Sequence, residues 1–391
     1  MPIARLRTYR GPALLSYGFR PFFLFGSIYA GAMIPVWLCV FEGELFPPTA
    51  FAPLDWHIHE MLFGYVAAII GGFLLTAIPN WTGRLPLQGT PLATLVSVWL
   101  AGRLAVWVSA WIGWEISCLI DAAFLILLAA AAAREIIAGR KWSNLPLVAI
   151  VSLFGVCNVA FHIEAQVNGR AYYSMRSGIA LVIVLVAVIG GRIVPSFTRN
   201  WLARQHAGRM PIPFGRFDAV VIAAGAAALI AWIIAPTAET TGIAMIVAGC
   251  LHLVRLARWA GFRTVRDRLV LILHLAYVFV PTGYFLLGGS AFGLVPTSAG
   301  IHAWTGGAIG TMTLAVMTRA TLGHTGGELK ASRGTQFLYA AVIAAALLRI
   351  CASVSPEHLQ ALLAAAGTGW AVAFIGFAIL YGRMLCSPRR P

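Results

Sequence analysis

Two histidines and a glutamate stand where a long apolar segment begins, in the stretch DWHIHEMLFGYV at residues 55–66. Imidazole nitrogens bind iron and copper, and a neighbouring carboxylate can ligate the same ion or relay protons. Ionisable groups inside apolar helices cost roughly 2.5–3.5 kcal/mol on membrane-insertion scales, so they usually serve a function. We therefore interpret His57 and His59 as candidate metal ligands and Glu60 as the candidate catalytic group. The alternative for Glu60 is a carboxylate held at a helix start by the helix dipole.

Membrane helices must position these side chains. The chain has 391 residues, of which 60% are hydrophobic and 10% charged, whereas soluble domains carry about 25% charged residues. A spanning helix needs roughly 20 mostly apolar residues. Twelve such runs follow one another, at residues 22–41, 57–80, 92–111, 114–134, 146–166, 173–197, 217–235, 240–260, 269–289, 299–320, 335–354 and 359–382. The sequence predicts an all-α polytopic membrane protein with twelve transmembrane helices, which form one domain over residues 1–391.

The basic residues indicate which way the helices face. The net charge is +15, and cytoplasmic loops of membrane proteins collect lysine and arginine. When the N-terminus is placed inside, most basic residues fall in cytoplasmic loops, while Glu42, Glu44, Glu239 and Glu357 fall outside. We therefore expect both termini in the cytoplasm and no nucleic-acid partner. Residues 1–12 lack the pattern of a cleavable signal peptide, so we expect the first helix to stay in the chain.

A glycine pair recurs along the chain. Gly71 begins GGFLLTAIPNWTG, Gly190 begins GGRIVPSFTRNWL and Gly306 begins GGAIGTMTLAVMTRATLG, at spacings of 119 and 116 residues. A fixed internal period indicates repeated structural units. We expect three units of four helices related by a pseudo-threefold axis, at about residues 13–135, 136–260 and 261–385. Chance recurrence of glycines, which are common in membrane helices, is the alternative.

The charge-based topology sorts the histidines by depth. His57 and His302 fall near the outer face, and each is followed by small residues that leave room for a flat macrocycle. One histidine from each of two helices at the same depth is the arrangement that a bis-imidazole haem requires. The alternative is that each is hydrogen-bonded to a backbone carbonyl. His59 lies about 200° around a helix from His57, so it points elsewhere and, with His162, could bind copper.

A second pair of histidines lies nearer the cytoplasm. His252 and His274 fall in consecutive helices at depths that agree within roughly 3 Å, at a rise of 1.5 Å per residue. They could therefore face each other across a second haem or a copper ion. The alternative is a metal-free pair that is hydrogen-bonded to Arg255 or Tyr277.

Two arginines lie inside predicted helices. Arg176 enters the sixth helix from the outer side, where it could clamp a haem propionate by charge-assisted hydrogen bonds. The alternative for Arg176 is an arginine that extends to the membrane surface. Arg103 lies in the middle of the third helix, too deep to reach water easily, so we expect a buried partner, with Asp121 on the fourth helix as the candidate.

Long strings of the chain resemble the NnrS family, membrane proteins of the bacterial nitric oxide response that contain haem and copper. The matching strings are YGFRPFFLFG at 17–26, WHIHEMLFGYVAAIIGGFLLTAIPNWTGR at 56–84, GGRIVPSFTRN at 190–200, LHLVRL at 251–256, LHLAYVFVP at 273–281 and IGTMTLAVMTRATLGHTG at 309–326. The resemblance extends over nearly the full length. It implies a multi-pass protein of the bacterial inner membrane, with haem and copper as cofactors and nitric oxide as ligand or substrate.

The chain also resembles, more weakly, the catalytic subunit of haem-copper oxidases, which has twelve spans in three arcs of four. That family's second helix reads histidine, methionine, an aromatic pair and Gly-Gly-Phe, and here His57, Met61 and the glycine pair from Gly71 follow that order. Its tenth helix carries the opposing haem histidine where this chain has His302, so the resemblance implies haem b between His57 and His302. The family's second tenth-helix histidine is replaced by Gly300, and the sixth and seventh helices hold no histidines for copper. An oxidase-type binuclear centre is not expected.

We expect a haem protein, with or without copper, that binds or reduces nitric oxide within the lipid bilayer. If it is an enzyme, it is an oxidoreductase that forms nitrous oxide, with Glu60 as a proton relay. A bis-histidine haem has no open coordination position, so turnover requires a second site and enzyme status stays open. The alternatives are a metal or haem transporter and a non-catalytic membrane factor that supports denitrification. The sequence does not identify the electron donor.

Overall fold

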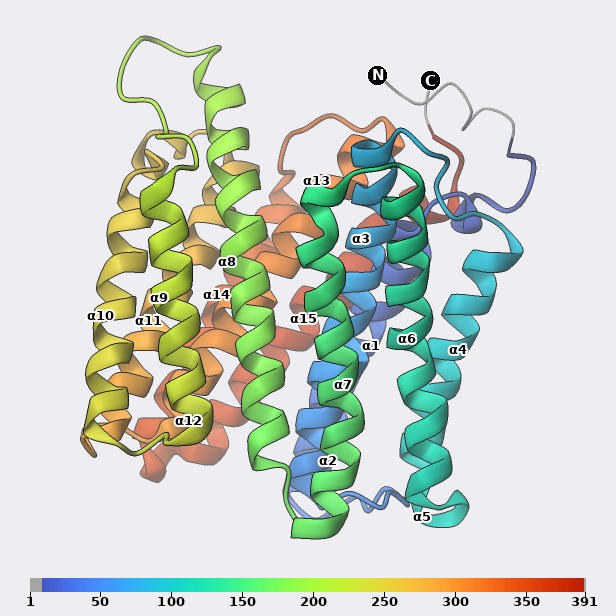
Figure 1. The fold of residues 1–391 in the computed structure, drawn as a ribbon, viewed down its shortest axis with the longest axis vertical. Helices are drawn as coiled ribbons and strands as arrows, with labels where there is room; N and C mark the ends of the chain where they lie inside the picture. Colours follow the sequence, from blue (N-terminus) through green and yellow to red (C-terminus); the bar gives the residue numbers. More distant parts are fainter. Residues whose placement is uncertain (1–8, 390–391) are drawn as a thin grey trace. The chain divides into compact units, whose positions relative to one another are not determined.

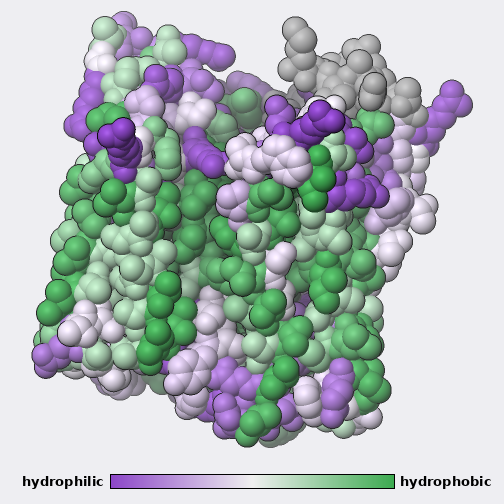
Figure 2. Space-filling model, viewed as in Figure 1, coloured by the Kyte–Doolittle hydropathy of each residue, from purple (hydrophilic) through white to green (hydrophobic). Residues whose placement is uncertain are grey.

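The computed structural model describes residues 9–389, and every regular element in that range is helical (Figure 1). Eleven of its helices are long and apolar enough to cross a membrane. Figure 2 shows apolar residues along the sides of the helices and polar residues gathered at their ends. Large apolar side chains such as Leu104, Leu119 and Val167 are exposed, as lipid contact requires. The prediction of an all-α multi-pass membrane protein is confirmed.

The helices follow the predicted runs closely. Their bounds are α1 Phe19–Phe41, α2 Pro53–His59, the π-helix η3 Glu60–Val66, α3 Ala67–Thr82, α4 Thr90–Trp107, α5 Ser109–Ile112, α6 Trp114–Ala138, α7 Leu145–Asn168, α8 Tyr172–Leu202, α9 Arg216–Ile234, α10 Glu239–Ala257, α11 Arg268–Ala291, α12 Thr297–His302, the π-helix η6 Ala303–Gly310, α13 Thr311–Thr325, α14 Arg333–Val354 and α15 Leu359–Cys386. Short 3₁₀ turns are found at Ala13–Leu15, Trp142–Asn144, Gly261–Thr264 and Pro356–His358.

The predicted tenth span, residues 299–320, lies within α12, η6 and α13. This stretch is not among the eleven candidate spans. Its many glycines and threonines, together with His302, make it less hydrophobic than the other long helices. The structure therefore gives eleven candidate spans where the sequence predicted twelve.

The helices group into two compact units. Unit 1 comprises residues 9–178, Ala320–Gly327 and residues 374–389. Unit 2 comprises Ile179–Arg319 and Glu328–Ala373. The three repeats of four helices inferred from the glycine pairs stay a prediction.

Within unit 1, the start of α1 lies beside the ends of α13 and α15. Arg20, on the first turn of α1, donates hydrogen bonds from Nη1 to the carbonyl oxygens of Leu385 (2.8 Å) and Ser387 (2.7 Å). The ring of Tyr17 stacks on His324 near the end of α13, with centroids 5.5 Å apart. These three helix ends therefore lie on one side of unit 1.

Each unit contains one π-helix, and each π-helix begins directly after a histidine. In unit 1, η3 follows His59, and in unit 2, η6 follows His302. The wider π turn leaves some backbone carbonyls for other donors, and Trp99 Nε1 donates to the carbonyl of Gly64 within η3 (2.9 Å). Short π segments occur frequently at functional sites, so both segments are candidate positions for such a site.

Candidate metal centre

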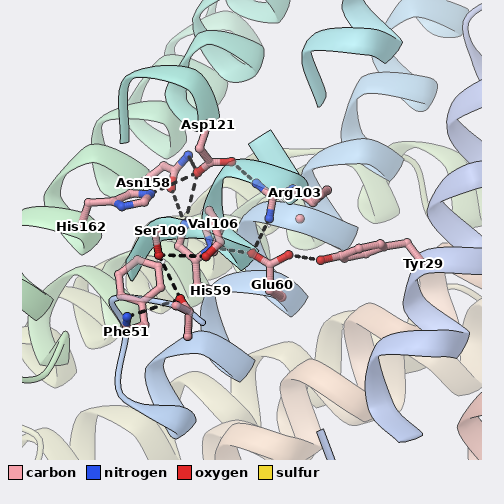
Figure 3. A network of polar contacts seen from close by, with 12 residues as sticks. Tyr29, Phe51, His59, Glu60, Arg103, Val106, Ser109, Asp121, Asn158 and His162 are labelled. Carbon is pink, nitrogen blue, oxygen red and sulfur yellow. Dashed lines mark hydrogen bonds and ion pairs between the residues drawn. The ribbon is translucent and has the colours of Figure 1, made fainter. Parts of the chain in front are cut away.

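Side chains from six helical segments of unit 1 meet at one point, shown in Figure 3. They are Tyr29 of α1, His59 at the end of α2, Glu60 at the start of η3, Arg103 of α4, Asp121 of α6, and Asn158 and His162 of α7. The two α7 side chains are four residues apart, which places them on one face of the helix.

Two histidines and one aspartate form a potential metal-binding group. Each offers one ligand atom, and the three atoms lie within 4.8 Å of one another. Asp121 Oδ2 is 3.2 Å from His59 Nε2 and 3.3 Å from His162 Nε2. The three residues are buried, with exposed fractions of 0% for His59, 3% for Asp121 and 1% for His162. Two imidazole nitrogens and one carboxylate oxygen are a donor set that suits iron, copper and other transition metals.

Arg103 joins the two carboxylates of the cluster. Its Nη1 donates to Glu60 Oε1 (2.6 Å), and its Nη2 donates to Asp121 Oδ1. The predicted pairing of Arg103 with Asp121 inside the membrane helices is confirmed. Glu60, as a second partner of Arg103, was not anticipated.

The remaining polar atoms of the cluster hold His59 from both sides. His59 Nδ1 lies 3.0 Å from Glu60 Oε1, and His59 Nε2 lies 2.9 Å from Asn158 Oδ1. The amide of Asn158 donates to Asp121 Oδ2 (2.7 Å), and the hydroxyl of Tyr29 donates to Glu60 Oε2. Such hydrogen bonds orient imidazole and carboxylate ligands around a metal.

The charges of the cluster do not balance. With neutral histidines, Glu60 and Asp121 carry two negative charges against one positive charge on Arg103. An uncompensated charge in a dry interior is costly. A cation at the three donor atoms would offset the excess, and so would a proton on His59, since both of its ring nitrogens face oxygen acceptors.

Two glycines allow the charged groups to approach the helix backbones. A Cβ atom at Gly64 would lie 2.8 Å from Arg103 Nη1, and one at Gly102 would lie 2.9 Å from Asp121 Oδ1. Neither position has room for a side chain unless the arginine or the aspartate moves. The glycines of η3 and α4 are therefore part of what lets the cluster form.

Aromatic rings surround the two histidines. The ring of Phe51 lies 4.9 Å from those of both His59 and His162, and Phe63 and Phe161 lie 5.4 Å from His59. All three phenylalanines are buried. This wall keeps water from the cluster, which strengthens its electrostatic interactions.

The two histidines predicted to ligate haem lie in different units. In unit 1, the ring of His57 stacks on that of Trp37, with centroids 4.5 Å apart and planes 14° apart. In unit 2, His302 Nδ1 lies 2.8 Å from the carbonyl oxygen of Ser298, one turn earlier in α12. His57 and His59 do point to different surroundings, as their spacing predicted. The pairing of His57 with His302 stays a prediction.

Arg176 lies on the first turns of α8, in unit 1. Its guanidinium sits over the ring of Tyr173, 5.1 Å from the centroid. Its Nε is buried and lacks a hydrogen-bond partner among the described residues. The role of Arg176 as a propionate clamp stays a prediction.

The inner histidines of unit 2 each have a hydroxyl partner. His252 Nδ1 lies 2.9 Å from the Tyr277 hydroxyl, and His274 Nε2 lies 2.8 Å from Thr198 Oγ1. The contact of His252 with Tyr277 matches the hydrogen-bonded alternative considered for this pair. A metal shared by His252 and His274 stays a prediction.

Sequence reasoning missed two members of the unit 1 cluster and the candidate metal-binding role of a third. Asn158 and Tyr29 were not singled out, and Asp121 was expected only as the partner of Arg103. The sequence did contain a signal for Asn158. It is a polar residue in an apolar run, four residues before His162, and this spacing places the two side chains on one face of a helix. Tyr29 carried no comparable signal, since a tyrosine in a membrane protein is commonly an interfacial residue.

The fold and the cluster define a class: a polytopic helical membrane protein with a buried histidine–carboxylate site that could hold a metal. A family model described as "NnrS protein" matches residues 13–389, nearly the whole chain. The chain therefore belongs to the NnrS family, which indicates a membrane protein of the nitric oxide response. A search of curated proteins found no match.

Proposed function

We propose that this NnrS protein holds a transition-metal ion at His59, Asp121 and His162 and responds to nitric oxide by binding it at that ion. The observation that carries the proposal is the convergence of these three donors on one buried point. The excess negative charge of the cluster also favours a cation there. The two-histidine, one-carboxylate set suits iron(II) with open coordination positions, and imidazole ligands also suit copper.

The surrounding residues have defined roles in this proposal. A bound iron or copper ion supplies a coordination position for nitric oxide and one-electron redox chemistry. With a metal at His59 Nε2, Glu60 Oε1 would accept from His59 Nδ1 and orient the ring, and the amide of Asn158 would orient the Asp121 carboxylate. Glu60 and the Tyr29 hydroxyl hold a proton next to the site, where it would be needed if nitric oxide is reduced. Nitric oxide is small and apolar, so it reaches a site walled by phenylalanines through the bilayer.

Metal analysis of the purified protein tests the proposal. The wild type is expected to retain iron or copper, and addition of nitric oxide is expected to give a metal–nitrosyl EPR signal. His162→Ala should bind the metal at least about 10-fold more weakly, the lower end of the loss of affinity known even for residues that only support the ligands, and should therefore retain less metal. His358→Ala is the matched control, because the side chain of His358 is 70% exposed near the start of α15.

Equal metal content in the His162→Ala and His358→Ala proteins would refute the metal site. The cluster would then balance its charge by a proton on His59, and unit 1 would be held by a metal-free ion-pair network. A protein that retains the metal but gives no nitrosyl signal would contradict the binding of nitric oxide at the metal and would leave the metal site itself standing.

Haem b ligated by His57 and His302, with Arg176 near a propionate, is a second proposal taken from the family resemblance. It is supported by the contact between His302 Nδ1 and the Ser298 carbonyl. A carbonyl only accepts, so Nδ1 carries the proton and Nε2 holds the lone pair, as in haem-ligating histidines.

Difference spectra test the haem proposal. The reduced-minus-oxidised spectrum of the wild type is expected to show the α and β bands of a low-spin b-type haem. His57→Ala and His302→Ala should each abolish these bands, while His358→Ala should keep them. A normal low-spin spectrum in either the His57→Ala or the His302→Ala protein would refute the ligation of one haem by these two histidines.

We also propose twelve crossings with both termini in the cytoplasm of a bacterial inner membrane. Support comes from the hydrogen bonds of Arg20 to the carbonyls of Leu385 and Ser387, which join the start of α1 to the end of α15. An even number of crossings returns the chain to its starting side, whereas eleven would not. The segment α12–η6–α13 is the candidate for the twelfth.

A further inference from the structure

The hydroxyl of Tyr277 has a fixed hydrogen-bond direction inside unit 2. It lies 2.8 Å from Arg255 Nη1 and 2.9 Å from His252 Nδ1. A guanidinium only donates, so the phenol oxygen accepts from Arg255, and among the described residues His252 Nδ1 is the acceptor within hydrogen-bond distance of the phenol proton. His252 Nδ1 is therefore the unprotonated nitrogen, ready to receive that proton.

Arg255 cannot turn away from this arrangement. Its Nε donates to Asp218 Oδ1 (2.9 Å), and its Nη1 also donates to the carbonyl of Ala187 (2.9 Å). The arginine and Tyr277 are both 0% exposed. The ion pair with Asp218 neutralises the guanidinium, so the phenol and the imidazole face each other without an additional net charge.

Aromatic rings connect this pair along the length of unit 2. Trp259 lies 4.6 Å from Tyr277, and on the other side His252 stacks on Tyr284 at 5.2 Å, with the planes 14° apart. Tyr284 in turn lies 4.9 Å from Trp304. Tyr277 and Tyr284 are seven residues apart on α11, about 10 Å at 1.5 Å per residue. The rings form a continuous series of short steps.

The series ends at opposite ends of the α9–α10 hairpin. Trp232, 5.6 Å from Trp304, lies near the end of α9, while Trp259 follows the end of α10. Ile230 and Ile234, on the same turn as Trp232, are 57% and 68% exposed on the lipid-facing surface. An oxidant dissolved in the bilayer therefore comes within a few side-chain widths of the outermost ring.

We infer that Tyr277 is a redox-active tyrosine that is oxidised to a neutral radical by a membrane-dissolved one-electron oxidant. The phenol loses one electron through the ring series, and its proton moves to His252 Nδ1, which becomes an imidazolium. The oxidant is of the nitrogen-oxide radical class, represented by nitrogen dioxide, which takes the electron and leaves as nitrite. This choice of oxidant rests on the proposed nitric oxide function, whereas the oxidation of Tyr277 does not.

Buried aromatic rings are more often simple packing, so the test must detect the radical. The full-length protein in detergent is oxidised by flash illumination with a ruthenium tris-bipyridine sensitiser and persulfate, then frozen for EPR. The wild type is expected to show a tyrosyl radical. Tyr277→Phe should lose most of that signal. Tyr339→Phe is the matched control, because Tyr339 is buried in the same unit and its hydroxyl is hydrogen-bonded to Thr318.

His252→Gln separates proton transfer from hydrogen bonding. The glutamine carbonyl can accept the phenol hydrogen bond but cannot take up the proton, so the radical signal should fall as it does in Tyr277→Phe. A signal unchanged in Tyr277→Phe, or absent from the wild type, would overturn the inference. If these variants do not fold, the test is ENDOR of the wild-type radical before and after exchange into D₂O. A radical whose phenoxyl oxygen has no exchangeable proton hydrogen-bonded to it would also overturn the inference.

A second measurement tests the oxidant. Anaerobic nitrogen dioxide should produce the same radical, together with an equal amount of nitrite beyond that which the hydrolysis of nitrogen dioxide yields with the Tyr277→Phe protein. Formation by ruthenium but not by nitrogen dioxide would overturn the choice of oxidant. Metal content is measured in the same samples, so a metal-free protein that forms the radical would contradict the proposed metal centre and leave the Tyr277 inference standing.

Discussion

Asp121→Asn is expected to lower the free energy of unfolding by about 1–3 kcal/mol, because it leaves a buried donor without an acceptor while Arg103 keeps its ion pair with Glu60. The two oxygens of Asp121 accept from Arg103 on one side and from Asn158 on the other, with His59 and His162 also close to Oδ2. Asparagine has one oxygen, so its amide nitrogen must face donors on one of these sides. Either Arg103 or Asn158 therefore loses the oxygen atom to which it donates.

Thermal or denaturant unfolding of the detergent-solubilised protein checks this expectation. Glu135→Gln is the matched control, because Glu135 also pairs with two arginines, Arg84 and Arg134, but these side chains are 45% and 69% exposed. Exposed ion pairs contribute about 0–1 kcal/mol, so this variant should unfold close to the wild type. Equal stability of the two variants would mean that the Asp121 network does not support unit 1.

The second large effect is expected from Gly191→Ala in unit 2. A Cβ atom at Gly191 would lie 1.9 Å from Arg255 Nη2 and 2.8 Å from its Cζ, so the guanidinium must move. Arg255 is 0% exposed, and moving it breaks its bonds to Asp218, the Ala187 carbonyl and Tyr277. Breaking a buried ion pair costs about 3–5 kcal/mol, and we expect a loss near the lower end because the pair is displaced but not deleted.

The neighbouring Gly190→Ala provides the control for the same helix. Its Cβ would lie 3.4 Å from the ring of Tyr277, an ordinary contact. Alanine is favoured over glycine in a helix by roughly 0.5–1 kcal/mol, so this variant should be as stable as the wild type or slightly more stable. Unfolding curves of the Gly191→Ala and Gly190→Ala proteins, measured side by side, test this explanation. Similar losses of stability in both proteins would show that crowding of Arg255 is not the cause.

The sequence by itself determined that this is a multi-pass helical membrane protein. Long apolar runs have few alternatives in a bilayer, since every backbone group must be bonded within its own helix. The observed α4, Thr90–Trp107, and α6, Trp114–Ala138, lie close to the predicted runs. The same logic identified Arg103 as a buried cation and Asp121 as its partner, because a charge that deep in a helix requires one.

Only the tertiary structure decided which polar groups meet. His59 and His162 are 103 positions apart in sequence, and helical spacing determines the direction of a side chain only relative to its own helix. The packing of α2 and η3 against α4, α6 and α7 brings His59, Asp121 and His162 together, and this packing depends on small residues such as Gly64 and Gly102. The buried cluster is therefore a property of helix packing, which periodicity along one chain segment does not contain.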